Sequence, residues 1–181
     1  MKKNTLMVNL FAGPGASKST LAAAIFADLK TENVDCELVT EFAKYATWEN
    51  NQLALNDQFY TSSNQYHREY VVYGKVDVIV TDSPILLGLM YFNDPNERKF
   101  MGLRKYLFEC FNERKNLNIF IERVKQYNPN GRNQTQQQAI ELDSKINQFL
   151  NENKIPYINI TGNTDGKEVV VKEILKIVKG E

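Results

Sequence analysis

A glycine-rich turn followed by Lys-Ser-Thr could bind phosphate groups. Residues 11–20 read Phe-Ala-Gly-Pro-Gly-Ala-Ser-Lys-Ser-Thr, between an apolar run and a segment with helical periodicity. Two glycines permit a tight loop whose backbone N–H groups face inward, at the positive end of the helix that follows. Lys18 would bridge the β- and γ-phosphates of ATP, and the Ser19 hydroxyl would bind Mg²⁺. We therefore expect the nucleotide to be held by Gly13, Pro14, Gly15, Ala16, Ser17, Lys18, Ser19 and Thr20.

This turn departs from the P-loop pattern G-x-x-x-x-G-K-[ST] at two positions. Ala12 replaces the first glycine and Ser17 replaces the second. A side chain at position 17 restricts the backbone where the loop is tightest. The substitution leaves open a slow enzyme, or a protein that binds nucleotide without transferring phosphate.

Two acids follow strands that we expect to be parallel. Asp82 ends the apolar run 76–81, and Glu41 follows the run 36–40. Because the carboxyl ends of parallel strands form the ligand crevice, both carboxylates are expected to open into one crevice, with the phosphates between them. Asp82 would lie near Mg²⁺, and Glu41 would take the proton of an attacking hydroxyl. The alternative for Glu41 is a solvated acid at the start of a helix.

The polar segment 122–135 has the composition of a mobile lid. It carries Arg123, Lys125, Tyr127 and Arg132. Phosphoryl transfer spreads negative charge over the equatorial oxygens, and guanidinium groups from a closing lid offset that charge. Arg132, with Arg123, is therefore a candidate catalytic residue. The alternative is an ordinary basic surface loop.

Polar residues are interleaved with aromatic ones along 52–73, a stretch that we expect to be mostly helical. Gln65, His67 and Arg68 could contact a base that stacks on the aromatic side chains, with Gln65 reading its edge. The alternative is an aromatic stripe that belongs to the core, with surface polar residues beside it.

Short apolar runs alternate with segments of helical periodicity along the chain. We expect strands at 5–11, 36–40, 76–81, 117–121 and 157–160, and helices at 18–30, 96–115, 134–151 and 166–179. This alternation predicts a parallel sheet covered on both faces, a three-layer α/β/α sandwich.

The bulk composition indicates one domain that spans residues 1–181. The chain has 22 Lys and Arg residues and 22 Asp and Glu residues, so it carries no overall basic field for nucleic acid. Cys36 and Cys110 stand in no metal-binding spacing, and we expect them to be buried thiols. The apolar run 6–12 is too short for a signal segment or a membrane span, so a cytoplasmic protein is expected.

Five blocks together resemble the bacteriophage P-loop kinases of the AAA-like nucleoside-kinase group. These blocks are residues 9–20, 39–44, 65–68, 81–84 and 127–134. The group includes phage 5-hydroxymethyluracil DNA kinases and is more distantly similar to ribosylnicotinamide kinase domains. The resemblance implies a P-loop NTPase fold with sheet order 2-3-1-4-5. It places Lys18, Ser19, Glu41, Asp82 and Arg132 on functional motif positions.

The sequence therefore predicts an ATP-dependent kinase that phosphorylates a hydroxyl of a nucleoside-type acceptor. The leading acceptor is 5-hydroxymethyluracil in phage DNA, in which case the protein would work in the host cytoplasm. Nicotinamide riboside, a free nucleoside and a nucleoside monophosphate remain open. Lys44 joins Glu41, Gln65, His67 and Arg68 as residues expected to contact the acceptor. The alternative of another class is a nucleotide-dependent switch or binding module without an acceptor.

Overall fold

A five-stranded parallel sheet forms the centre of the molecule. The computed structural model describes residues 3–92, 98–124, 127–128 and 134–180. The strands are β1 (Leu6–Phe11), β2 (Cys36–Val39), β3 (Val78–Thr81), β4 (Lys115–Glu122) and β5 (Ile158–Thr161). Their order is β2-β3-β1-β4-β5 and every neighbouring pair is parallel. The predicted sheet order and P-loop NTPase fold are confirmed.

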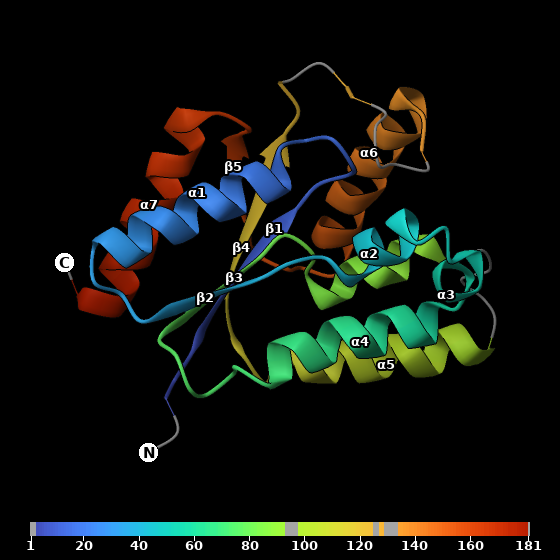
Figure 1. Cartoon of the computed structure of the whole chain (residues 1–181), viewed down its shortest axis with the longest axis horizontal. Helices are drawn as coiled ribbons and strands as arrows, with labels where there is room; N and C mark the ends of the chain where they lie inside the picture. Colours follow the sequence, from blue (N-terminus) through green and yellow to red (C-terminus); the bar gives the residue numbers. More distant parts are fainter. Residues whose placement is uncertain (1–2, 93–97, 125–126, 129–133, 181) are drawn as a thin grey trace.

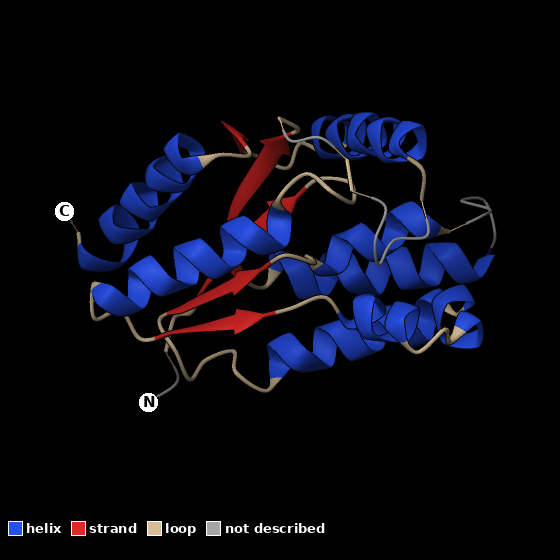
Figure 2. Ribbon diagram, turned by 45° about the horizontal axis from the view of Figure 1, so that its top comes forward, coloured by secondary structure: helices blue, strands red, loops and turns tan. Residues whose placement is uncertain are grey.

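Helices cover both faces of this sheet (Figure 1). Helices α1 (Lys18–Thr31) and α7 (Thr164–Lys179) pack on one face through Ile25, Leu29, Val170 and Ile174. The opposite face is covered by the 3₁₀ helix η1 (Ile85–Tyr91), α5 (Arg98–Asn112) and α6 (Gln136–Glu152). Figure 2 shows the strands between these helical layers. The central strands β1 and β3 are buried along their whole length, as expected for strands covered on both faces.

The stretch between β2 and β3 differs from the predicted helix at 52–73. It forms α2 (Phe42–Trp48), α3 (Gln52–Asn56) and α4 (Gln58–Tyr70). Two side chains start new helices within it: Asn51 accepts the Ala54 N–H at 3.1 Å, and Asp57 accepts the Tyr60 N–H at 2.9 Å. Each such cap satisfies a backbone donor that a helix start leaves unpaired, so the path bends at both positions. The helix α2 and the 3₁₀ helix η1 were not predicted.

Other boundaries lie within a few residues of those predicted. Helix α6 begins at a capping box, in which Thr135 and Gln138 each accept a backbone N–H of the other. Cys36 and Cys110 are both buried and form no disulfide. In the described ranges, no helix combines the length and the apolar character that crossing a membrane requires.

Candidate functional site

The segment that joins β1 to the first turn of α1, which we call the phosphate loop (residues 12–19), turns sharply at two positions. Gly15 has φ of +81°, and Ser17, directly before α1, has φ of +71°. Position 17 is therefore a left-handed position, which glycine adopts without strain and serine does not. The loop keeps this conformation although the sequence supplies a side chain there.

Lys18 lies over the loop that precedes it. Its Nζ donates to the backbone oxygens of Ala12 at 2.8 Å and Gly13 at 2.9 Å. The pKa of Lys18 lies below its ordinary value, because burial desolvates the ammonium group more than the nearby charges of Glu41, Asp82 and Asp143 stabilise it. Three carboxylates thus favour the ammonium form in the place where a phosphate would be neutralised.

Asp82 and Glu41 meet where β3 and β2 end. Asp82 is only 2% exposed, and its Oδ1 accepts the backbone N–H of Glu41 at 2.9 Å. This bond fixes the first residue of the α2 turn beside the end of β3. Because β2 and β3 are neighbours in the sheet, Glu41 and Asp82 lie together, close enough for their charges to act on Lys18.

The oxygen donors around Lys18 suit Mg²⁺. Ser19 and Asp82 both border the cavity described below and offer hard oxygen ligands. Within the described part of the chain, no group of three or more His, Cys, Asp and Glu residues could hold a metal ion by itself. A small donor set fits Mg²⁺, which usually takes one or two protein oxygens and fills its octahedron with phosphate oxygens and water.

A cavity of about 480 Å³ opens next to the phosphate loop. Its walls come from the loop, α2, α3, α4, η1 and the turn after β3. The residues proposed from the sequence that line it are Pro14, Gly15, Ser17, Lys18, Ser19, Thr20, Glu41, Lys44, Gln65 and Asp82. The cavity thus joins the expected phosphate residues, except Gly13 and Ala16, to part of the expected acceptor residues.

His67 and Arg68 are not among the residues that line this cavity. Arg68 instead stacks over the rings of Phe42 at 5.2 Å and Tyr45 at 5.0 Å and donates to the Thr40 oxygen at 3.3 Å. Gln65 holds the same helix from the inside, since its Oε1 accepts the Phe42 N–H at 2.9 Å. Both side chains therefore fix the start of α2, which carries Glu41 at its N-cap.

Two residues at this site were not predicted from the sequence. Tyr91, at the end of η1, is 40% exposed and lines the cavity, and desolvation, with the charges of Glu41 and Asp143, raises the pKa of its hydroxyl. Asp143, on α6, accepts the Gly13 N–H at 2.5 Å. The available signal was the position of Asp143 beside Leu142 and Ile146 on the apolar stripe of its helix, where an acid is out of place.

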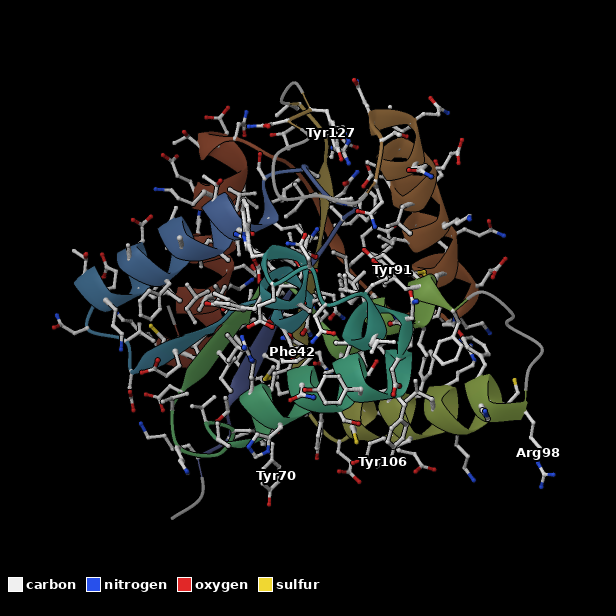
Figure 3. The ribbon with its side chains drawn as sticks, turned by 45° about the vertical axis from the view of Figure 1, so that its right-hand side comes forward. Phe42, Tyr70, Tyr91, Arg98, Tyr106 and Tyr127 are labelled. Carbon is white, nitrogen blue, oxygen red and sulfur yellow. The ribbon has the colours of Figure 1, made fainter. Side chains whose placement is uncertain are left out.

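The start of the predicted lid lies against the phosphate loop. A Cβ added at Gly15 would be 2.9 Å from Tyr127 Cδ2 and 3.1 Å from Arg123 Nη1. Figure 3 shows Tyr127 near the end of β4, with Phe42 and Tyr91 below it in that view and Tyr70 and Tyr106 at the opposite end of the molecule. Arg132 and Lys125 lie outside the described residues.

Comparisons with known proteins agree with this fold. A structure titled "Crystal structure of NadR protein in complex with NR" superposes with a TM-score of 0.70 at 13% identity over 98% of this chain. This chain spans only 52% of that NadR chain. The structure of deoxyadenosine kinase from M. mycoides with bound dATP superposes with a TM-score of 0.59 at 16% identity, covering 96% of this chain and 97% of the other.

Identities this low show a shared fold. No curated protein matches the sequence. A family model described as an AAA domain matches residues 7–167, which is most of the chain. The chain therefore belongs to this AAA domain family.

Proposed function

We propose that the protein transfers the γ-phosphoryl group of ATP to a hydroxyl of a nucleoside-type acceptor. The observation that carries this proposal is one continuous cavity that is lined by both Lys18 of the phosphate loop and Glu41, which follows β2. A nucleotide-binding module needs Lys18 but not Glu41. A carboxylate that faces the same space is needed by an enzyme that must take a proton from an acceptor.

The residues divide the chemistry between them. The backbone N–H groups of the phosphate loop and the Lys18 ammonium would bind the triphosphate, and Ser19 and Asp82 would hold Mg²⁺. Bound there, Mg²⁺ would supply positive charge to the phosphate oxygens. Glu41 accepts the proton of the acceptor hydroxyl. The hydroxyl oxygen then forms a bond to the γ-phosphorus, while the bond from that phosphorus to the bridging oxygen breaks and ADP leaves with this oxygen. Arg123 and Arg132 offset charge that develops on the transferring group.

The cavity walls favour an acceptor with a planar ring and polar edges. Phe42, Trp48 and Tyr91 offer aromatic surface, while Thr61 and Gln65 offer polar atoms. A volume of about 480 Å³ falls in the range of small-molecule sites. The sequence resemblance favours 5-hydroxymethyluracil in DNA as the acceptor. The structural neighbours, NadR in complex with NR and a deoxyadenosine kinase, favour nicotinamide riboside or a deoxynucleoside.

A transfer assay with γ-labelled ATP and Mg²⁺ tests this proposal. The acceptor panel contains deoxynucleosides, nicotinamide riboside, nucleoside monophosphates and duplex DNA with 5-hydroxymethyluracil. We expect label on one class of acceptor with the wild-type protein and none with Lys18→Ala. Binding of ATP without label transfer to any acceptor would instead support the nucleotide-dependent switch.

A further inference from the structure

One carboxylate on α6 joins the phosphate loop to the start of the lid. Asp143 Oδ1 accepts the backbone N–H of Gly13 at 2.5 Å. Asp143 Oδ2 accepts from Arg123 Nε at 3.0 Å and Nη2 at 2.9 Å. The side chains of Arg123 and Asp143 are only 12% and 16% exposed, so water screens this pair weakly.

The close approach of α6 to the loop depends on Gly13. A Cβ there would lie 2.6 Å from the Ala139 oxygen and 2.8 Å from Asp143 Oδ1. Real Cβ atoms do not come so close to backbone oxygens. The absence of a side chain at position 13 therefore lets Asp143 reach the loop.

The two bonds to Asp143 determine how the guanidinium of Arg123 is turned. The Nε–Nη2 edge faces the carboxylate, which leaves Nη1 on the other side. Nη1 is buried and has no hydrogen-bond partner among the described residues. It lies 3.1 Å from the place where a Gly15 Cβ would be, against the loop that carries the expected phosphate site. A buried charged donor without a partner is costly unless a ligand supplies the acceptor.

We propose that Asp143 is a positioning residue that holds Arg123 so that its Nη1 donates to a phosphate oxygen of the bound nucleotide. This inference rests on the nucleotide binding in the proposed function. It adds Asp143 as a residue that acts on the nucleotide through Arg123. A carboxylate this near a triphosphate would by itself repel it. The two oxygens of Asp143 accept hydrogen bonds from Gly13 and Arg123, so its negative charge is compensated. Its remaining effect is to orient the Arg123 guanidinium.

A double-mutant cycle in ATP affinity tests this inference without an acceptor. Binding of ATP with Mg²⁺ is measured by calorimetry for the wild type, Arg123→Ala, Asp143→Asn and the double variant. A charge-assisted hydrogen bond contributes about 1.5–3 kcal/mol, so Arg123→Ala is expected to weaken binding about 10- to 100-fold. Asp143→Asn is expected to weaken it about 10-fold by the same scale.

The double variant separates positioning from an independent role. If Asp143 acts through Arg123, the double variant binds ATP no more weakly than Arg123→Ala. Losses that multiply, or tighter binding by Asp143→Asn alone, would overturn the inference. Glu141→Gln is the matched control, since it removes an exposed carboxylate from the same helix, where it accepts from Gln137. Thermal melting of each variant shows whether the protein is still folded.

Chemical rescue provides a readout that a purely structural role would not change. Millimolar guanidinium is expected to restore part of the ATP affinity of Arg123→Ala, because Asp143 can hold the free ion in place. The double variant is expected to gain none, and equal rescue of both variants or no rescue of Arg123→Ala would overturn the inference. A wild type that binds ATP but transfers no phosphate would refute the kinase proposal and leave the cycle intact. A wild type that does not bind ATP would refute both.

Discussion

At the scale of single residues, Ser17 shows what the sequence could and could not indicate. The pattern marks position 17 as a glycine position occupied by serine. Only the structure shows that the backbone there remains left-handed, with φ of +71°. The loop shape is therefore maintained by its surroundings, including the Asp143 bond to Gly13, against the preference of the local residue.

Replacing Ser17 with glycine is expected to stabilise the folded protein by about 1 kcal/mol, because glycine adopts positive φ without a Cβ clash. Chemical denaturation measures the change. Ser144→Gly is the control, since Ser144 lies in the ordinary helical backbone of α6 and its replacement is expected to destabilise by a few tenths of a kcal/mol or more. A destabilised Ser17→Gly would show that the serine side chain itself holds the loop.

Lys18→Ala is expected to reduce ATP turnover by at least about 10²-fold, since a charge aimed at developing phosphate charge is lost from a partly buried site. The melting temperature is expected to stay close to the wild-type value, because the hydrogen bonds of Nζ to described residues go to the loop itself. Lys30→Ala, at an exposed position on the same helix, is the control for turnover. Turnover near the wild-type rate in Lys18→Ala would refute the phosphate-loop assignment.

At the scale of elements, short polar side chains explain where prediction stopped. Apolar periodicity was sufficient for β1, β3 and α1, whose buried faces are continuous. Apolar periodicity did not reveal the breaks within residues 42–70, because they come from the polar side chains of Asn51 and Asp57, which cap new helices and stand outside that pattern. Nor could it place Asp143 at the loop, since that contact joins residues 130 apart in the chain.

A buried ion pair ties α4 to the start of β4. Glu69 and Arg114 bond to each other with side chains 1% and 6% exposed, and Arg114 also lies 5.2 Å from the Tyr66 ring. At pH 8, Glu69→Ala is expected to destabilise by about 3–5 kcal/mol, because it leaves Arg114 buried without its partner. Glu109→Ala breaks an exposed pair with Lys105 and is expected to change stability by less than about 1 kcal/mol. Similar effects of the two variants in denaturant melts would refute this expectation.

The same carboxyl group makes stability depend on pH. Burial, opposed by Arg114, raises the pKa of Glu69 from 4.5 to about 7. Between these values the folded chain keeps a proton that the unfolded chain has released, so stability falls as pH rises through that window. The decline is at most about 1.4 kcal/mol per pH unit. Glu69→Gln is expected to remove this part of the slope, and parallel curves for the two proteins would contradict it.

At the scale of the whole molecule, the parallel sheet brings distant residues to one edge. The phosphate loop follows β1, Glu41 follows β2, Asp82 follows β3 and Arg123 follows β4. Figure 1 shows α2, α3 and α4 on one side of this edge and α6 on another. The sheet order could be predicted from the sequence together with its resemblance to a known group, and it places Glu41 beside Asp82 through neighbouring strands.

In the proposed reaction, Glu41 serves the acceptor and not the nucleotide alone. Glu41→Gln keeps the size of the side chain and removes the base. Transfer of labelled γ-phosphate from ATP and the affinity for ATP are measured on the same preparations, at several Mg²⁺ concentrations. We expect transfer to fall by about 10²–10⁴-fold while ATP affinity is retained. Unchanged transfer would contradict the account, and so would an ATP affinity that drops and becomes strongly dependent on Mg²⁺, which would make Glu41 a metal-site residue.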